Sequence, residues 1–234
     1  MESEHPHYST SEKVIDNPIG YPVSSEMMMA MSKIIRHDIR NKLAIIMGYQ
    51  DITRMKLAKG EDVEIYLDGI KKNCLKILSI LDINRDFEKL GTEDKVSQNV
   101  SSCFYRAAEF FNLSEIEVQC ACGNLEVLAD SLLIRLFYHL IDNSLKHGET
   151  LSNIKLYNEG DYRLIYEDDG GGIPDDKRAN IYNHSLEHAG VHGLTLINKI
   201  IESYNWTLTE EGKPQAGVRF VIDLPKNTRR RLKN

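Results

Sequence analysis

The chain has 234 residues, of which 41% are hydrophobic and 27% charged, and its formal net charge is −6. This is ordinary globular composition for one or two domains, and the negative charge argues against nucleic acid as a partner. No window approaches the roughly 18 uninterrupted apolar residues of a membrane-spanning helix, and four cysteines do not make a disulfide framework in a chain of this length. We therefore expect a cytosolic, reduced protein with no membrane segment.

Residues 1–24 are polar, contain three prolines, and are predicted to be a linker. Residues 25–92 then predict a helical hairpin. Its first helix begins near Ser25 and runs to Leu57 with apolar residues at three- and four-residue steps, and its second helix follows Asp62. Because the connection is short, the two helices must lie antiparallel. One hairpin leaves apolar surface uncovered, so we expect a homodimer in which two hairpins form a four-helix bundle.

Residues 93–226 alternate between helical and strand-like patterns and predict a second domain. The helical patterns cover residues 98–112, 130–147 and 191–204, and the strand patterns cover residues 116–121, 125–129, 153–158, 162–167, 206–209 and 218–224. Helices mixed with hairpin-connected strands are typical of an α+β sandwich with the helices on one face of the sheet. Residues 227–234 are a short basic tail, which we expect to be frayed and solvated.

The first candidate for chemistry is His37, which begins the stretch His-Asp-Ile-Arg-Asn-Lys-Leu on the first helix. Asn41 comes one helical turn later on the same face, and Asp38 is adjacent. A neutral imidazole is a usable nucleophile, and a carboxylate can hold its other N–H and fix the tautomer. Taken alone, a polar cluster on a helix face is more often solvated surface than a site.

The second candidate is the stretch from Asp142 to Gly148, late in a predicted helix. Asn143 and Lys146 are three residues apart and share a face. An amide oxygen suits Mg²⁺, which prefers oxygen ligands, and a lysine one turn later can meet a phosphate. An asparagine late in a helix is not unusual in itself, so ordinary polar helix surface remains the alternative.

Two glycine-rich stretches follow. The stretch from Asp168 to Pro174 has three consecutive glycines after a strand, so its backbone can approach a ligand closely. An acidic group at the strand end can accept a hydrogen bond from an exocyclic amine, as in adenine. The stretch from Gly190 to Leu196 opens a helix, and a glycine-rich helix N-terminus is a natural phosphate site. Taken alone, the first stretch also fits a glycine hairpin, and the second is a weak motif.

The order and spacing of the four motifs resemble the transmitter module of sensor histidine kinases, over roughly residues 25–226. The resemblance implies a dimeric hairpin with the phosphorylated histidine, and an ATP-binding domain of the fold shared by histidine kinases, gyrase, Hsp90 and MutL. It implies ATP- and Mg²⁺-dependent autophosphorylation, transfer to a response-regulator receiver domain, and phosphatase activity toward that regulator. Such a module is cytoplasmic, by itself or as the cytoplasmic portion of a larger, membrane-bound sensor.

Carried over by motif position, the resemblance assigns a role to each candidate residue. His37 is the phosphoacceptor, Asp38 is its acidic partner, and Asn41 is the position associated with phosphatase activity. Asn143 is the Mg²⁺ ligand, and Asp168 reads adenine. The remaining nucleotide contacts are Lys146, His147, Gly170, Gly172, Gly190, Gly193 and Leu194.

The sequence departs from the family pattern in four places. The Mg²⁺-binding asparagine expected one turn before Asn143 is His139, and an imidazole is a poor Mg²⁺ ligand. The usual third glycine of the last motif is Thr195. The helix-bending proline after the phosphoacceptor is Lys42, so we expect a straighter first helix. The segment 175–189, the family's ATP lid, is short and lacks the usual aromatic pair.

Two other functions compete with a kinase. The departures favour, as the runner-up, a phosphorelay adaptor or binding module with a degenerate nucleotide site. Inside the lid, residues 184–188 read His-Ser-Leu-Glu-His and match the H-x-x-E-H pattern of zinc peptidases. An isolated five-residue pattern is prone to false matches, and a peptidase would not explain the glycines on both sides.

Overall fold

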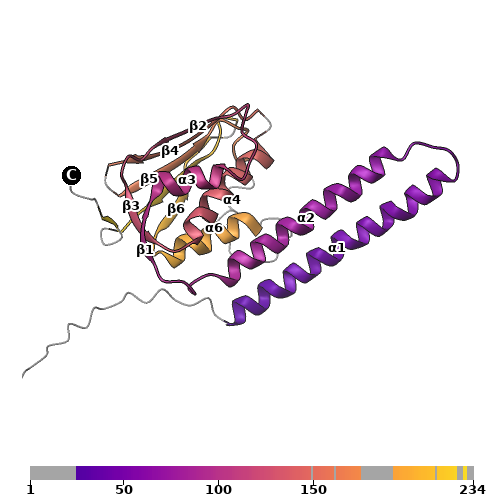
Figure 1. Ribbon diagram of the computed structural model, residues 1–234, viewed down its shortest axis with the longest axis horizontal. Coiled ribbons are helices and arrows are strands. Elements are labelled where there is room, and N and C mark those ends of the chain that lie inside the picture. The colour runs from indigo at the N-terminus through magenta and orange to yellow at the C-terminus, as the bar shows by residue number, and fades with distance from the viewer. Residues whose placement is uncertain are drawn as a thin grey trace, which may run out of the picture.

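The computed structural model describes residues 25–148, 150–160, 162–174, 192–213, 215–225 and 229–230. Within these residues the chain forms a long helical hairpin and a mixed α/β domain that packs against one end of it (Figure 1). The described helices include none that is long and apolar enough to cross a membrane. The predicted architecture, a helical hairpin followed by an α+β domain, is confirmed.

The hairpin consists of helix α1, Ser25–Leu57, and helix α2, Glu64–Glu88. Gly60 turns the chain between them with a φ of 70°, a backbone conformation that residues with a side chain rarely adopt. Asp62 then accepts a backbone N–H at the start of α2 at 3.0 Å, which satisfies one of the free donors there. Helix α1 continues past Lys42 without interruption, as the missing proline predicts.

The second domain is built on a five-stranded sheet in the order β2-β4-β5-β7-β6. β2 and β4 run parallel, and the other neighbours are antiparallel. The strands are β2 Glu117–Ala121, β4 Asn153–Glu159, β5 Arg163–Asp168, β6 Thr207–Glu210 and β7 Arg219–Asp223. Alternate residues of the three central strands share one face because of the pleat, and they are buried: Ile154, Leu156, Leu164, Tyr166, Phe220 and Ile222.

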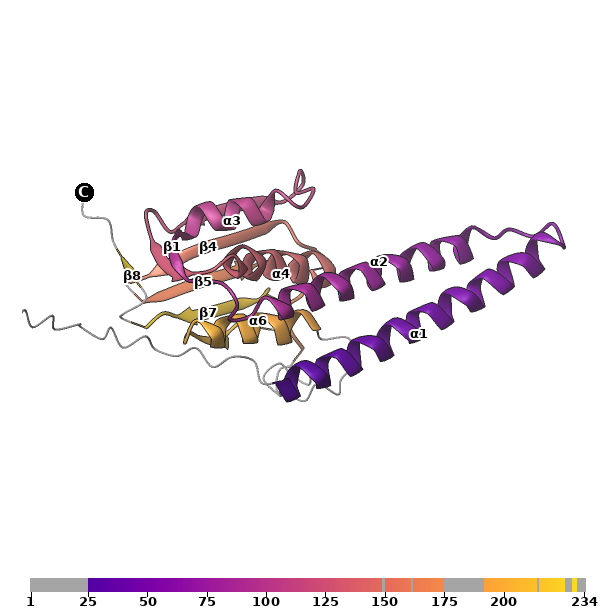
Figure 2. The same cartoon turned by 60° about the horizontal axis from the view of Figure 1, so that its bottom comes forward.

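Within the described ranges, three helices cover one face of this sheet: α3 Val100–Ala108, α4 Leu132–His147 and α6 His192–Ser203 (Figure 2). Their apolar sides join the buried strand residues in one core, where Phe104 of α3 meets Phe137 of α4 edge-on with ring centroids 5.7 Å apart. Ser131, and not Asp130 as the sequence predicted, is the N-cap residue of α4. Asp130 lies one residue earlier, and its Oδ1 accepts the N–H of Leu132, the first residue of the helix, at 2.9 Å. Because α4 packs on this core, the position of its C-terminal end, which carries the second motif, is set by the core.

Two short segments differ from the sequence-based expectation. Residues 98–99, expected in a helix, belong to strand β1, Val96–Asn99, because Asn99 caps the following helix and starts it later. β1 pairs with β3, Glu126–Ala129, and β3 pairs with β8, Arg229–Arg230. The expectation of a frayed tail is therefore wrong at these two arginines, since their backbone joins the edge of a small sheet.

The hairpin and the domain share buried apolar residues where they meet. Ile83 and Phe87 of α2 belong to the same core cluster as the helices of the domain, and so do Met31 and Ile35 of α1. Figure 2 shows the end of α2 lying beside α4 and α6. Ile39 also packs on this cluster, so the first motif lies in the part of α1 that shares this core.

Candidate functional site

Asp168 ends strand β5 and is held by three hydrogen bonds. Its Oδ1 accepts the N–H of Gly170 at 3.0 Å and the N–H of Val218 at 3.1 Å. Its Oδ2 accepts the hydroxyl of Ser144 at 2.5 Å. A carboxylate has roughly four lone-pair positions, so acceptor capacity remains after these three bonds. The residue predicted to read adenine is thus half-buried, preorganised and still able to accept a hydrogen bond.

Ser144 and Tyr166, which the motif comparison did not single out, support Asp168 from inside the core. The Ser144 Oγ lies 2.8 Å from the Tyr166 hydroxyl, and both side chains are buried. Because Ser144 gives its single proton to Asp168, Tyr166 is the donor to Ser144. Burial raises the pKa of Tyr166, which keeps it protonated. The sequence does contain a signal for Ser144. The helical period of α4 places it on the same buried face as Leu140 and Phe137.

The glycines after Asp168 let their loop pack directly on the end of α4. A Cβ on Gly170 would lie 2.7 Å from the Cα of Gly148, which is closer than real Cβ atoms come. Gly172 has a φ of 68°, and a Cβ there would lie 2.7 Å from the carbonyl oxygen of Lys213. Glycine at 170 and 172 is therefore required by the packing of the site's own backbone. Direct contact of these residues with a nucleotide stays a prediction.

Asn143, the candidate Mg²⁺ ligand, lies on α4 against the start of α6. A Cβ on Gly193 would lie 3.2 Å from the Asn143 Oδ1, so the second and fourth motifs are in contact. The Nδ2 of Asn143 is buried and has no hydrogen-bond partner among the described residues. Such an amide is rare and costs free energy, so this position suits a ligand that brings an acceptor. Leu194 follows Gly193 and packs partly buried on the core.

Lys146 and His147 lie in the last turn of α4 and are exposed, and the positive charge of Lys146 complements the end of the helix. The Nζ of Lys146 lies 2.6 Å from the Asp142 Oδ2 and 3.3 Å from the Ser79 Oγ of α2. Lys146 therefore contacts the hairpin as well as its own helix. Its predicted contact with nucleotide phosphate, and that of His147, stay predictions.

His139, one turn before Asn143, is turned toward the hairpin. Its Nε2 lies 2.9 Å from the Oδ2 of Asp86 on α2, and the same oxygen accepts the Nε–H of Arg135 at 2.6 Å. Burial raises the pKa of Asp86, but the hydrogen bonds from His139 and Arg135 outweigh it and hold the pKa below its ordinary value. The motifs do not predict this contact. Asp86 lies beside the buried residues Phe87 and Ile83 on α2, and a buried carboxylate indicates that a partner for its charge is near.

His37 lies on α1 between Asp38 and Asn41. Its Nδ1 lies 3.3 Å from the Asp38 Oδ1, and the Asn41 Nδ2 lies 3.3 Å from Nδ1 and 3.5 Å from Nε2. The His37 side chain is 68% exposed, whereas that of Asp38 is 9% exposed. A carboxylate only accepts, so in the neutral ring Nδ1 carries the proton and Nε2 the lone pair. The three residues predicted to act together are in contact.

Some predictions fall on residues that the structure does not describe. Gly190, the segment 175–189 and the H-x-x-E-H pattern at 184–188 all lie there. In the described parts of the chain, no group of three or more His, Cys, Asp and Glu side chains is placed to hold a metal ion. The zinc-peptidase alternative therefore stays untested.

Comparison with known proteins gives matches to both parts of the chain. Residues 129–228 match the family of histidine kinase-, DNA gyrase B-, and HSP90-like ATPases. Over 222 residues the chain is 26% identical to the sensory histidine kinase/phosphatase NtrB of Rhodobacter capsulatus. That alignment covers 84% of this chain, which spans 62% of the relative's length.

Solved structures share the fold across the hairpin and the domain. Histidine kinase ThkA, solved in complex with response regulator protein TrrA, has a TM-score of 0.62 at 20% identity, over 87% of this chain and 62% of that chain. Histidine kinase AdeS of Acinetobacter baumannii has a TM-score of 0.61 at 14% identity, over 82% of this chain and 98% of that chain.

These matches and the site geometry define the class of the second domain. Residues 129–228 form an ATPase domain of the histidine kinase, DNA gyrase B and HSP90 type. The hairpin that carries His37 precedes this domain, and histidine kinases match the chain across both parts. The chain as a whole is similar to sensor histidine kinases, so the resemblance predicted from the four motifs is confirmed.

Proposed function

We propose that this protein is an ATP-dependent autokinase of a two-component system, which phosphorylates His37 and passes the phosphoryl group to an aspartate of a response regulator. The observation that carries the proposal is the paired His37 and Asp38 on a hairpin that packs on an ATPase-family domain. The runner-up, an adaptor with a degenerate nucleotide site, has less support. Asp168 is held by three hydrogen bonds and can still accept another, and Asn143 lies against the start of α6.

His37 acts as the nucleophile. Asp38 accepts its Nδ1–H, which leaves the lone pair of Nε2 for attack on the γ-phosphorus of ATP. The Nε2–P bond forms while the bond from the γ-phosphorus to the bridging oxygen breaks, and ADP leaves with that electron pair. The ring becomes cationic when Nε2 is phosphorylated, and the Asp38 carboxylate beside Nδ1–H offsets this charge.

The nucleotide is proposed to lie between the end of β5, the end of α4 and the start of α6. Asp168 would accept a hydrogen bond from the adenine amine, and Lys146 would leave its exposed pair with Asp142 for a phosphate. Asn143 would give its Oδ1 to Mg²⁺. Its Nδ2, which has no hydrogen-bond partner among the described residues, supports a ligand with an acceptor at this position. When bound, Mg²⁺ neutralises charge on the phosphate oxygens during transfer. His139, which is held by Asp86, adds no second amide oxygen.

We propose that a second copy of the chain covers the hairpin. Large apolar side chains are exposed along both helices: Leu43, Ile45, Met47, Ile52 and Met55 on α1, and Leu67, Leu75, Leu78 and Leu81 on α2. Apolar stripes of this kind mark interaction surfaces, and a hairpin typically buries them in a four-helix bundle. The predicted homodimer is therefore the arrangement that covers this surface.

The second partner is proposed to be a receiver domain that docks where His37 and Asn41 face solvent. The relative ThkA was solved with a response regulator, and the relative NtrB is named both a kinase and a phosphatase. These names support a regulator as phosphoryl acceptor and a phosphatase activity for this chain. We also propose a cytoplasmic location, where ATP and the regulator are available.

The proposal is tested by incubation with γ-labelled ATP and Mg²⁺. Acid-labile label is expected on the wild-type protein and none on His37→Gln. Asp168→Asn should bind ATP at least about tenfold more weakly by calorimetry, because an amide replaces a charged acceptor of the adenine amine. Label that persists in His37→Gln would overturn the assignment of the phosphoacceptor. No ATP binding by the wild type at millimolar concentration would favour the adaptor instead.

A further inference from the structure

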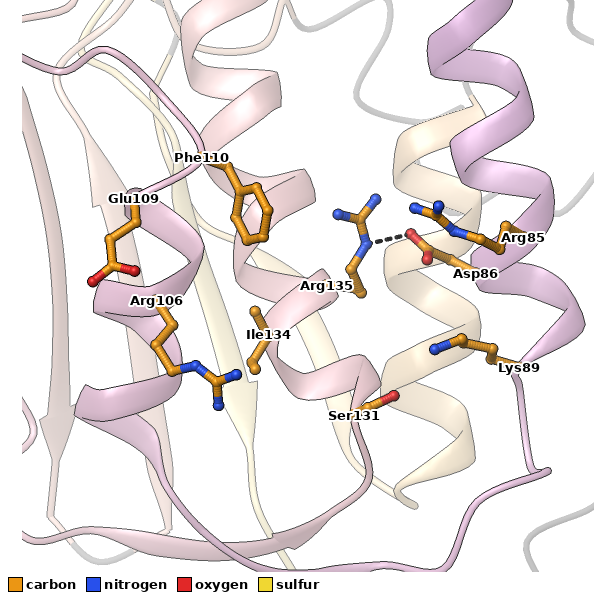
Figure 3. A pocket seen from close by; sticks show the side chains of 9 residues that line it. All are labelled: Arg85, Asp86, Lys89, Arg106, Glu109, Phe110, Ser131, Ile134 and Arg135. Carbon is orange, nitrogen blue, oxygen red and sulfur yellow. Dashed lines mark hydrogen bonds and ion pairs between the residues drawn. The ribbon is translucent and has the colours of Figure 1, made fainter.

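A cavity of about 620 Å³ lies where the end of the hairpin meets the domain (Figure 3). Arg85 and Lys89 line it from α2, Arg106 lines it from α3, and Arg135 lines it from α4. None of the residues assigned to the nucleotide or to phosphoryl transfer lies in its wall. Its volume is in the range of small-molecule sites in proteins.

The wall of this cavity is basic, although the whole chain has a net charge of −6. Four of its side chains are Arg or Lys and two, Asp86 and Glu109, are acidic. Asp86 is buried and already accepts hydrogen bonds from Arg135 and His139, so it does not neutralise the other cations. The low dielectric around a partly enclosed cavity strengthens the attraction of such a wall for anions.

Two of the four cations have unused hydrogen-bonding capacity. Arg135 donates its Nε–H to Asp86, but its Nη2 is buried and has no hydrogen-bond partner in the described part of the chain. Arg106 forms no ion pair with any carboxylate of the described residues. A buried guanidinium nitrogen without an acceptor is costly, so an acceptor at this position would stabilise the protein.

The other two cations make only weak pairs. Arg85 lies 3.0 Å from Asp82 and Lys89 lies 3.5 Å from Glu93, and all four side chains are well exposed. Exposed pairs contribute little to stability, so these cations can exchange their partners for a ligand. In Figure 3 the side chains of Arg85 and Lys89 extend from α2 toward α4.

The start of α4 at this cavity already attracts a carboxylate. Glu93 accepts the Ser131 N–H at 3.2 Å, and its hydrogen bond with the Ser131 side chain is the main reason that its pKa lies below its ordinary value. The positive end of the helix dipole favours anions in this way. Phe110, which is 65% exposed, and Ile134 add an apolar surface to the same wall.

We propose that this cavity binds a small polyanion with phosphate or carboxylate groups. Guanidinium groups donate strongly to both kinds of oxyanion, and the lysine adds a point charge. Because α2 supplies two cations and the domain supplies two, a bound polyanion holds the hairpin and the domain together. This binding does not depend on the proposed kinase function.

The test is calorimetric titration of the full chain at low salt with pyrophosphate and with citrate. Binding of at least one probe is expected, it should weaken as salt is added, and the tighter probe identifies the oxyanion class. The double variant Lys89→Gln, Arg106→Gln should bind at least about tenfold more weakly, since two charged contacts are lost. Lys72→Gln, an exposed lysine of α2 outside the cavity, is the matched control and should bind as the wild type does.

Pyrophosphate can also enter a nucleotide site, so Asn143→Ala is titrated beside the others and should bind the probes like the wild type. Three results would each overturn the proposal: no binding of either probe at millimolar concentration, unchanged binding by the double variant, or loss of binding in Asn143→Ala alone. If the chain bound the probes as expected but did not autophosphorylate, the proposed kinase function would fail and the polyanion site would stand.

Discussion

The Nε2 of His139 lies 2.9 Å from the Oδ2 of Asp86, a hydrogen bond that joins the ATPase domain to the hairpin. Both side chains are buried, with 3% of His139 and 1% of Asp86 exposed. Arg135 donates to the same oxygen, and its guanidinium lies 4.1 Å from the centre of the Tyr138 ring. The residue that departs from the family's Mg²⁺ motif is thus a structural contact between the two parts of the chain.

Replacing Asp86 by Ala is expected to lower the free energy of unfolding by about 3 kcal/mol, because the half-buried Arg135 and the buried His139 lose their shared acceptor. Urea unfolding followed by circular dichroism measures the change. Asp82→Ala is the control on the same helix, and its exposed pair with Arg85 should contribute less than about 1 kcal/mol. Equal effects of the two variants would contradict a special role for Asp86.

The same contact predicts how stability depends on pH. The pKa of Asp86 is held below its ordinary value, so its interactions are fully present above the ordinary carboxyl pKa of about 3.9. They are lost as the pH falls below that value through the lower native pKa, because the unfolded chain binds the proton first. The stability gap between the wild type and Asp86→Asn should therefore stay constant from about pH 6 to about pH 5 and shrink from there to about pH 3 in thermal unfolding. A gap that stays constant over this range would rule out the charge of Asp86 as its cause.

His139→Asn is predicted to lower the Mg²⁺ concentration needed for half-maximal autophosphorylation, since it restores an amide oxygen one turn before Asn143. The substitution also releases Asp86, so Asp86→Ala serves as the control that breaks the hairpin contact without adding an amide at position 139. A lower requirement in His139→Asn alone supports a metal ligand at this position. A lower requirement in both variants assigns the effect to the loosened contact, and no change in either means that position 139 does not face the metal.

Much of the architecture was predictable because its signals are local. The helix period of α1 and α2 and the strand alternation around Ile154 and Leu156 arise from residues close in sequence. The residues of the candidate site could be named from the sequence for the same reason, because Asp168 and the glycines after it form one short motif. Strand β1, Val96–Asn99, was missed because four residues carry no clear period and its partner, β3, is distant in sequence.

The contacts between motifs depend on docking that no local pattern encodes. Asp86 and His139 are 53 residues apart, and they meet only because α2 packs on α4. The Ser144 hydroxyl reaches Asp168 only because α4 crosses the end of β5. Sequence therefore indicated which residues are candidates for the chemistry, while their hydrogen bonds follow from how the layers pack.

The proposed homodimer predicts that a charge in the apolar stripe of the hairpin separates the subunits. Leu78, which is 57% exposed in the single chain, would be buried in a four-helix bundle, so Leu78→Lys should weaken dimerisation. Light scattering should give twice the chain mass for the wild type and about the chain mass for the variant at low concentration. Asp68→Lys, at an exposed polar position of the same helix, should remain dimeric. A wild-type protein that is a stable monomer would refute the bundle.

Asn41 is predicted to carry the phosphatase activity proposed for this protein. Its amide nitrogen lies 3.3 Å from Nδ1 and 3.5 Å from Nε2 of His37, so both side chains face the surface where a phosphorylated regulator must dock. An amide there can hold a water in line with an aspartyl phosphate without being a strong base. Asn41→Ala removes the amide and keeps good helix propensity.

This variant should retain autophosphorylation of His37, because Asp38 still orients the ring through Nδ1. It should slow dephosphorylation of the partner by about tenfold or more, the factor that corresponds to a loss of roughly 1.4 kcal/mol of transition-state stabilisation. Both rates are measured with labelled protein and a labelled receiver domain, with Lys42→Ala as the control one residue along the helix. If both activities fall together, the contact of Asn41 with His37 is structural. If neither changes, another group positions the water.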